Sequence, residues 1–242
     1  MKQSNYHWNE FSNRDDLARQ LADDITAILN ERVEKSGVAR IAVSGGSTPK
    51  PLFEALGESN IDWSRVMITL VDERAVNEHH ALSNAAFLKQ HLFTKLSVTP
   101  KFLPLYIEDA SFEDAQAHVL TQFRELAGSP PGQLPSFDVV VLGMGGDGHT
   151  ASFFPDAANI ADLVDATTNQ ALLTCESPST QVPRITWSLP VLLNTGSLIL
   201  HITGADKKKV FNTALSDDNA LELPIRAAIF QQSIPLNVYF AE

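Results

Sequence analysis

The sequence is poor in cysteine, in long apolar runs and in positive charge. Cys175 is the only cysteine among 242 residues, which excludes an intramolecular disulfide and a zinc site built on several thiolates. No apolar run reaches the length of a membrane-spanning helix, and the segment from Met1 to His7 has no apolar signal core. We therefore expect a protein of the cytoplasm, where thiols stay reduced.

The charge balance is strongly negative. The chain has 18 Lys and Arg residues against 29 Asp and Glu residues, which gives a formal net charge of −11 at pH 7. The electrostatic field of a protein with this charge repels nucleic acids and anionic membranes, so we expect neither as a partner. An anionic substrate would have to meet a local cluster of positive groups.

The remaining composition is that of an ordinary globular protein. Hydrophobic residues make up 44% of the chain and charged residues 19%. The length is sufficient for one large hydrophobic core. We expect a single domain that spans residues 1–242.

Apolar segments with strand and helix patterns alternate along the chain. Apolar residues three and four positions apart predict an amphipathic helix over residues 13–35. A short apolar strand, Arg40 to Ser44, then enters Gly45-Gly46, and Pro49 suits the start of a helix that ends near Gly57. The other expected elements are an apolar run over 65–71, helices over 83–93 and 111–127, a turn-rich connector over 128–132, strands over 137–142, 172–174, 197–203 and 236–240, and a last helix and strand within 223–242.

This alternation predicts an α/β fold: a doubly wound, mostly parallel sheet with helices on both faces. In such sheets ligands bind beyond the carboxyl ends of the strands. The loops that follow Val43, Val71 and Leu142 are therefore the places to look for chemistry.

The first of these loops has the composition of an anion site. It runs Ser44-Gly45-Gly46-Ser47-Thr48, directly before the helix that Pro49 starts. Glycines let the backbone approach a ligand, and the free N–H groups of a helix N-terminus favour an anion such as phosphate. The alternative is a polar turn in which Ser47 or Thr48 only caps the helix. The spacing of a P-loop is absent.

The second loop places Asp72, Glu73 and Arg74 after a buried strand. A guanidinium there can bind a phosphate or carboxylate at two points. Alternatively, Arg74 pairs with a neighbouring carboxylate at the surface. Asp72 and Glu73 can each hydrogen-bond a sugar or simply hold Arg74, and the sequence leaves this choice open.

The third loop, residues 143–150, carries the most informative pair. Its glycines match a dinucleotide-binding fingerprint formally, but Pro155 leaves little room for the long helix that such a fold needs. Asp147 lies two residues before His149 and can orient its imidazole as a general base, although a structural histidine is the competing interpretation. The other histidines show no metal-ligand spacing, so we expect no metal.

Taken in order, these motifs resemble the 6-phosphogluconolactonase family. The resemblance rests on Val43 to Pro49, Val71 to Arg74 and Leu142 to Ser152, and it continues through three shorter segments. These are Ser83-Asn84-Ala85, Arg184-Ile185-Thr186 and Thr203-Gly204-Ala205-Asp206-Lys207. It therefore covers most of the chain between about Ile41 and Phe211.

The resemblance implies an enzyme that hydrolyses 6-phosphoglucono-1,5-lactone to 6-phosphogluconate in the oxidative pentose phosphate pathway, without a cofactor. It implies that His149 activates water, that Asp147 supports it, and that Arg74 adds positive potential beside the lactone. The implied ligands of the phosphate and sugar are Ser44, Gly45, Gly46, Ser47, Thr48, Asp72, Gly145, Arg184 and Lys207. For two of them a purely structural role remains open: Lys207 can belong to a solvated helix start, and Arg184 can bridge loops.

Two other functions stay in view. Glucosamine-6-phosphate deaminases are similar in the same loops, but they typically have an acidic residue where this chain has Phe154 and an aromatic residue in place of Arg74. A non-catalytic regulator that binds a phosphosugar would be favoured by an appended DNA-binding segment, and the sequence contains none. The lactonase interpretation is therefore preferred.

Overall fold

The computed structural model describes residues 2–130, 132–180 and 182–242. Its helices are α1 Arg14–Ser36, α2 Lys50–Glu58, α3 Asn84–His91, α4 Phe112–Ala127, α5 Ile160–Leu163, α6 Leu189–Leu193, α7 Ala205–Ala214 and α8 Arg226–Ile229. Its strands are β1 Tyr6–Phe11, β2 Ala39–Val43, β3 Val66–Leu70, β4 Asp72–Arg74, β5 Lys101–Leu103, β6 Phe137–Leu142, β7 Leu172–Cys175, β8 Arg184–Trp187, β9 Thr195–Thr203 and β10 Leu236–Ala241.

The main sheet has seven strands in the order β1-β10-β9-β6-β2-β3-β5. Every pair of neighbours in this sheet is parallel. The central strand β6 is buried along its whole length, which explains why its sequence is apolar rather than alternating. The predicted α/β fold with a mostly parallel sheet is confirmed.

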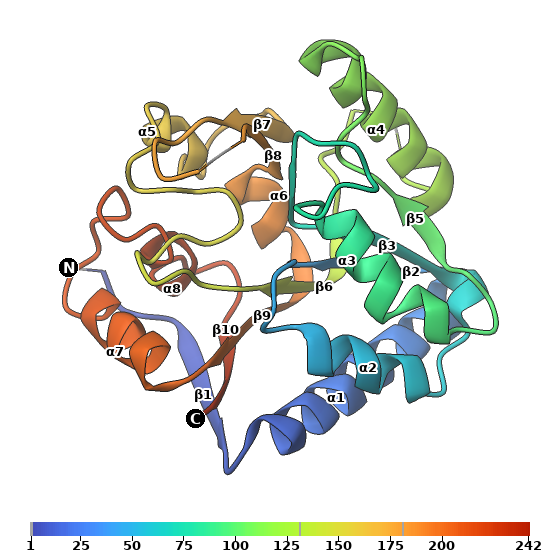
Figure 1. Ribbon diagram of the computed structural model, residues 1–242, viewed down its shortest axis with the longest axis horizontal. Helices are drawn as coiled ribbons and strands as arrows, with labels where there is room; N and C mark the ends of the chain where they lie inside the picture. The colour runs from blue at the N-terminus through green and yellow to red at the C-terminus, as the bar shows by residue number, and fades with distance from the viewer. Residues whose placement is uncertain (1, 131, 181) are drawn as a thin grey trace.

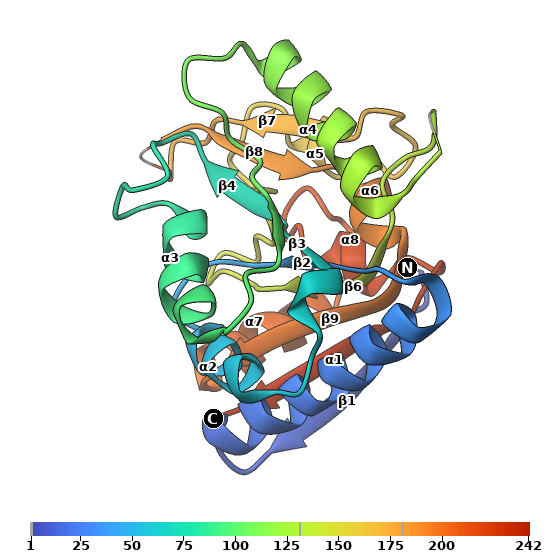
Figure 2. The same ribbon diagram turned by 90° about the vertical axis from the view of Figure 1, so that its right-hand side faces the viewer.

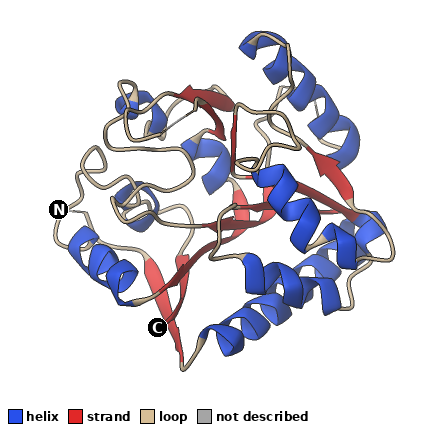
Figure 3. Cartoon of the chain, viewed as in Figure 1, coloured by secondary structure: helices blue, strands red, loops and turns tan. Residues whose placement is uncertain are grey.

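Helices cover both faces of this sheet (Figures 1 and 3). The long helix α1 packs on β1, β2, β6 and β10, and α2 packs on α1. Asn13 begins α1 by accepting a hydrogen bond from the backbone N–H of Asp16 at 2.8 Å, which satisfies one of the free donors of the first turn. On the opposite side lie α4 and a second, small sheet (Figure 2).

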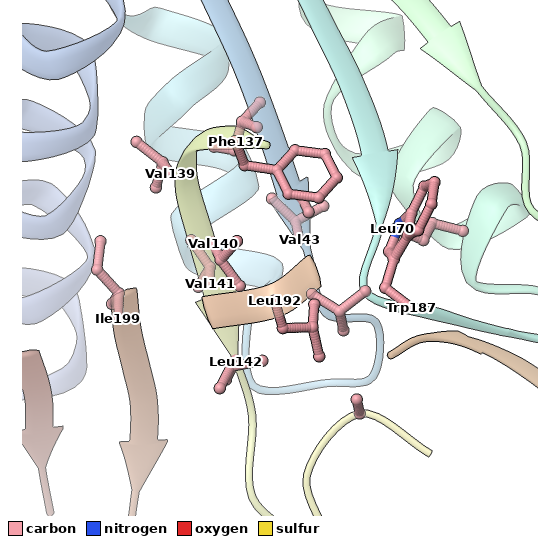
Figure 4. Close-up of a cluster of buried hydrophobic side chains, with 14 of the residues drawn as sticks. Val43, Leu70, Phe137, Val139, Val140, Val141, Leu142, Trp187, Leu192 and Ile199 are labelled. Atoms are coloured by element: carbon pink, nitrogen blue, oxygen red, sulfur yellow. The ribbon is translucent and has the colours of Figure 1, made fainter. Parts of the chain in front are cut away.

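The small sheet has three strands in the order β4-β8-β7, and both of its pairs are antiparallel. It is fixed to the main sheet by an aromatic cluster: Trp187 of β8 packs edge-on against Phe123 of α4 and Phe137 of β6. Figure 4 shows Phe137, Leu192 and Trp187 within this buried cluster. The cluster holds the strand that carries Arg184 in a fixed position over the main sheet.

The small sheet is also where the sequence predictions were incomplete. The segment from Asp72 to Arg74, expected as a loop, is strand β4. The strand expected over 172–174 exists as β7, but it lies in the antiparallel sheet. The connector expected over 128–132 is described only in part, since Pro131 lies outside the described residues. Among the described residues, no helix is long and apolar enough to span a bilayer.

The parallel arrangement brings the chemistry-bearing loops to one edge. Strands β9, β6, β2 and β3 are neighbours, so their carboxyl ends lie side by side. The segments that follow them start at Gly204, Gly143, Ser44 and Val71. The site expected at this edge can therefore draw on residues up to 160 positions apart in the chain.

Candidate active site

A cavity of about 230 Å³ opens at this edge of the main sheet. It is lined by Ser44, Gly45, Gly46, Ser47, Thr48, Pro49, Asp72, Arg74, Asn84, Val141, Leu142, Gly143, Met144, Gly145, His149, Ala151, Arg184 and His201. The structure thus brings three predicted loops and the predicted Arg184 to one place. Asn84 and His201 line the cavity as well, although neither was singled out from the sequence as a ligand.

His149 and Asp147 are in direct contact. The distance from His149 Nδ1 to Asp147 Oδ1 is 2.6 Å, and the backbone N–H of His149 donates to the same oxygen at 3.2 Å. Burial alone raises the pKa of Asp147, but the hydrogen bond and charge of His149 outweigh it and lower the pKa to about 2. An ionised Asp147 that accepts from Nδ1–H leaves Nε2 of His149 as the basic nitrogen.

The loop that carries this pair is held by its own backbone. Gly145 N–H donates to the carbonyl of His149 at 2.8 Å, and Gly148 N–H donates to the carbonyl of Gly145 at 3.2 Å. Thr150 Oγ1 donates to the carbonyl of Gly143 at 2.8 Å. Ala151 has a φ of 48°, in the left-handed region that residues other than glycine rarely adopt. The loop is therefore a closed turn, not a flexible connection.

Gly145 lines the cavity, but its clearest role is steric. A Cβ atom at this position would lie 2.1 Å from His149 Nδ1 and 2.4 Å from Asp147 Oδ1. No side chain fits there while the His149–Asp147 contact is kept. Gly145 was predicted as a ligand of the substrate, and that role remains a prediction.

Phe154 packs on His149 in a way that the sequence analysis did not foresee. The two rings are stacked, with centroids 4.2 Å apart and planes 26° apart. The guanidinium of Arg184 also packs on the ring of Phe154, with its Cζ 5.0 Å from the ring centroid. The residue that was noted only as a departure from the deaminases therefore contacts both the histidine and an arginine of the site.

Two guanidinium groups meet at the wall of the cavity. The antiparallel pairing of β4 and β8 places Arg74 directly opposite Arg184. Like charges at such a position repel each other, so the arrangement favours an anion between or beside them. In the part of the chain that the structure describes, the buried Nε atoms of both arginines have no hydrogen-bond partner.

Each arginine is partly held by the protein. Arg184 Nη1 lies 3.6 Å from Asp72 Oδ2, and Arg74 Nη1 donates to the carbonyl of Leu82. Burial lowers the pKa of Arg184; the charge of Asp72 opposes this effect and the charge of Arg74 adds to it. The expectation that Arg74 pairs with a neighbouring carboxylate at the surface is wrong, because its guanidinium lines the cavity and binds a carbonyl.

The structure separates the roles of Asp72 and Glu73. Asp72 lines the cavity, receives a hydrogen bond from Ser152 Oγ at 2.5 Å and pairs with Arg184. Glu73 points to the N-terminus of α3 instead. It accepts hydrogen bonds from Ser83 Oγ and from the backbone N–H groups of Arg74, Asn84 and Ala85. Glu73 therefore supports the site indirectly, because it holds the start of α3 in place beside the cavity.

Glu73→Ala is expected to lower the free energy of unfolding by about 3 kcal/mol, because several buried donors lose their acceptor at once. Burial raises the pKa of Glu73, and these donors oppose that rise. Urea unfolding of the variant measures the loss. Glu78→Ala is the matched control: Glu78 pairs with Lys89 at the surface, so its loss should cost less than about 1 kcal/mol. Equal losses in both variants would contradict this role for Glu73.

The first loop is joined to the third by Ser44. Its hydroxyl donates to the carbonyl of Val141 at 3.0 Å and accepts from the backbone N–H of Gly143 at 2.9 Å. The alternative in which Ser47 or Thr48 caps the helix is wrong. Pro49 occupies the N-cap position of α2, and no side chain among the described residues caps it. Pro49 and Pro51 have no N–H group, and Lys50 N–H donates to the carbonyl of Ser47 at 3.4 Å, so the donors that face the cavity belong to the loop before α2 and not to a full set of free helix N–H groups.

Gly45 permits a second close contact. A Cβ on Gly45 would lie 2.0 Å from Asn84 Oδ1, and Asn84 Nδ2 donates to the carbonyl of Asp72 at 3.0 Å. Asn84 therefore connects the first and second loops. It stood within a motif of the family resemblance, but nothing in its local pattern indicated this contact.

Lys207 is the one predicted ligand that does not line the cavity together with the others. It lies in the first turn of α7. Burial lowers the pKa of Lys207, and the negative charge of Asp147 opposes that effect, so the ammonium lies close to the loop that carries Asp147. Its binding of phosphate remains a prediction.

The C-terminal segment, for which the sequence suggested no role, supports the third loop. Ile225 N–H donates to the carbonyl of Gly148 at 2.9 Å. The buried Arg226 binds the carbonyl oxygens of Ala214 and Asn219, both at 3.1 Å. These contacts anchor the loop from 215 to 225 against the turn that carries His149.

Comparisons with known proteins agree with this geometry. A family model described as glucosamine-6-phosphate isomerases/6-phosphogluconolactonase matches residues 12–235. The chain belongs to this family.

Named relatives are lactonases. The 6-phosphogluconolactonase of Rhizobium meliloti (strain 1021) is 39% identical over 231 residues, which cover 96% of this chain and 97% of that protein. The 6-phosphogluconolactonase of Pseudomonas aeruginosa is 36% identical over 224 residues, or 92% of this chain and 90% of that protein. The crystal structure of a 6-phosphogluconolactonase from Shewanella baltica OS155 superposes with a TM-score of 0.87 at 36% identity and covers 98% of each chain.

Proposed function

We propose that this protein is an enzyme that hydrolyses 6-phosphoglucono-1,5-lactone to 6-phosphogluconate, with the whole chain as one lactonase domain. The observation that carries the proposal is the shared cavity: His149, which is in direct contact with Asp147, lines the same space as two arginines placed opposite each other. A base and a local cluster of positive charge are what the hydrolysis of an anionic ester requires. The names of the relatives support the same substrate.

The anionic end of the substrate is assigned to the positive side of the cavity. Ser47 and Thr48, which line the cavity directly before α2, offer their hydroxyl groups to a phosphate, and Arg184 offers its guanidinium. Lys207 would add its charge from the edge of the site. The net charge of the protein is −11, so most of its surface repels a phosphorylated substrate. This local cluster of positive groups attracts the substrate to the cavity.

The chemical step is a proton transfer coupled to an addition. Nε2 of His149 takes a proton from water, and the hydroxide formed attacks the C1 carbonyl of the lactone. The tetrahedral intermediate then collapses, the C1–O5 bond breaks, and the imidazolium returns its proton to the departing ring oxygen. Asp147 holds the imidazole in the required tautomer and stabilises its charged form, while Arg74 stabilises the negative charge that develops on the former carbonyl oxygen.

The other branch of the family, the glucosamine-6-phosphate isomerases, is disfavoured by the surroundings of His149. The ring of Phe154 covers one face of the imidazole at 4.2 Å. An acidic residue at this position, typical of the deaminases, would give the histidine a second carboxylate partner. Among the described residues, Asp147 is the carboxylate that contacts the imidazole.

A direct assay tests the proposal. Freshly prepared 6-phosphogluconolactone is mixed with the protein, the product is oxidised by 6-phosphogluconate dehydrogenase, and spontaneous hydrolysis is subtracted. The proposal requires a rate that rises in proportion to the protein concentration. A rate that stays at the spontaneous value over a wide range of protein concentration would overturn it.

Asp147→Asn is expected to lower kcat/KM by about 10- to 100-fold, because the amide lacks the negative charge that orients and supports the imidazole of His149. The contact with His149 lowers the pKa of Asp147 to about 2, so the carboxylate stays ionised from neutral pH down to about pH 3 and this support is not lost in that range. Steady-state rates of the two proteins measure the loss. Asp162→Asn, an exposed carboxylate of α5, is the control. Wild-type kcat/KM in Asp147→Asn would argue against this support.

A further inference from the structure

His201 is a polar residue in the buried and otherwise apolar run 198–202 of strand β9. It lies in β9 between Leu200 and Ile202, which are 0% and 1% exposed, and is itself only 4% exposed. The neighbouring strand β6 ends where Leu142 pairs with Leu200, so His201 lies level with the start of the catalytic loop. Its side chain contributes to the lining of the cavity.

The imidazole of His201 is not used by the protein itself. Over the ranges that the structure describes, its Nδ1 is buried without a hydrogen-bond partner. Burial lowers the pKa of His201 to about 4, so the ring is neutral at physiological pH. A neutral imidazole has one N–H and one lone pair. Because Nδ1 is buried without a partner, the tautomer protonated on Nε2 is the one that offers its N–H to a ligand in the cavity that His201 lines.

The same cavity contains the loop directly before α2, which offers hydroxyl donors to an anion. Ser47 and Thr48 line the cavity together with His201. In the described chain no side chain caps α2, so neither hydroxyl is used as a helix cap. A phosphate bound beside Ser47 and Thr48 would receive hydrogen bonds from these hydroxyl groups and from the imidazole.

We propose that His201 is a specificity-determining residue whose Nε2–H binds the phosphate group of the substrate beside Ser47 and Thr48. This rests on the proposed function for the identity of the substrate, but the binding of phosphate itself does not. A neutral donor in a cavity that already holds two arginines adds a hydrogen bond without a further repulsive charge. It accounts for the presence of an imidazole where an apolar side chain would pack at lower cost.

Two variants separate this role from simple packing. His201→Phe keeps a ring of similar size and removes both nitrogens. His201→Gln retains an amide N–H near the position of Nε2–H. His118→Gln, an exposed histidine of α4 outside the cavity, is the control.

The primary measurement is the binding of inorganic phosphate by calorimetry, because it does not depend on turnover. His201→Phe is expected to weaken phosphate binding about tenfold, and His201→Gln to restore it to within about threefold of the wild type. In turnover, the KM of His201→Phe for 6-phosphogluconolactone should rise, while its KM for unphosphorylated glucono-1,5-lactone should not. Phosphate binding of wild-type strength in His201→Phe would overturn the proposal.

A second measurement covers the case in which His201→Phe does not fold. The ¹⁵N shifts of His201 in the wild-type protein are expected to report the tautomer protonated on Nε2, with a shift change when phosphate is added. A ring protonated on Nδ1, or no response to phosphate, would overturn the proposal. If the wild type fails to hydrolyse the lactone but binds phosphate through His201, the proposed function is wrong and the phosphate site stands.

Discussion

His149→Ala is expected to lower kcat for 6-phosphogluconolactone by about 10²- to 10⁴-fold, the range that a positioned general base contributes. The lactone hydrolyses without help in water, so the variant should retain some acceleration from the bound position of the substrate. The binding of 6-phosphogluconate should change little, because the donors assigned to the phosphate belong to other elements. Stopped-flow rates and calorimetry on the same preparation measure both quantities.

The controls for this variant are chosen from the chain itself. His149→Gln keeps a side chain that can donate to Asp147, whose oxygen lies 2.6 Å from Nδ1, but it cannot take up a proton near neutral pH. It should be as slow as His149→Ala if proton transfer is the role of the histidine. His79→Ala removes a histidine whose side chain is 85% exposed and should behave as the wild type. Near-normal turnover in His149→Ala would contradict the general-base assignment.

Gly145→Ala is expected to lower kcat about 10²-fold although it alters no group that takes part in the reaction. The added methyl group would lie 2.1 Å from His149 Nδ1, and the stacked ring of Phe154 limits the retreat of the imidazole. A displacement of about 1 Å at a catalytic group is sufficient for a loss of this size. Single-turnover rates would measure it.

The neighbouring glycine provides a matched control. A Cβ on Gly146 would meet no atom within 4 Å. Gly146→Ala should therefore turn over within a factor of about two of the wild type. Equal activity in the Gly145 and Gly146 variants would show that the contact of His149 with Asp147 is not sterically constrained as described.

The main sheet could be predicted because its signals are local. Strands such as β2 and β6 are mainly apolar and are followed within two residues by a glycine, and the start of α1 is marked by a capping asparagine. Strand β1 was missed because its residues are mostly half-buried and mix polar with aromatic side chains. It is an edge strand, and its partner β10 lies at the other end of the chain.

The small sheet could not be predicted for a different reason. Strand β4 is only Asp72, Glu73 and Arg74, which carries no apolar pattern at all. Its partner β8 lies more than a hundred residues away, so the pairing of Arg74 with Arg184 is a property of the tertiary fold. The sequence indicated both arginines through the family resemblance, but not that they would lie opposite each other.

Within the site, the sequence identified side chains and missed their contacts. The spacing of Asp147 and His149 was a sufficient signal for their contact, because two residues in a tight turn can reach each other. The stacking of Phe154 on His149 depends on the turn that follows and left no mark in the sequence. The sequence does mark His201, because it is the single titratable residue in the apolar run from Leu198 to Ile202, which the structure buries.

One comparison of two substrates separates the lactonase branch of the family from the isomerase branch. The same protein sample is offered 6-phosphogluconolactone and glucosamine 6-phosphate in parallel, with product oxidation followed for the first and ammonia release for the second. We expect protein-dependent hydrolysis of the lactone and no ammonia release, with the lactonase kcat lowered by about 10²- to 10⁴-fold in His149→Ala. Ammonia release without acceleration of lactone hydrolysis would contradict this expectation and assign the His149 site to the isomerase branch of the family.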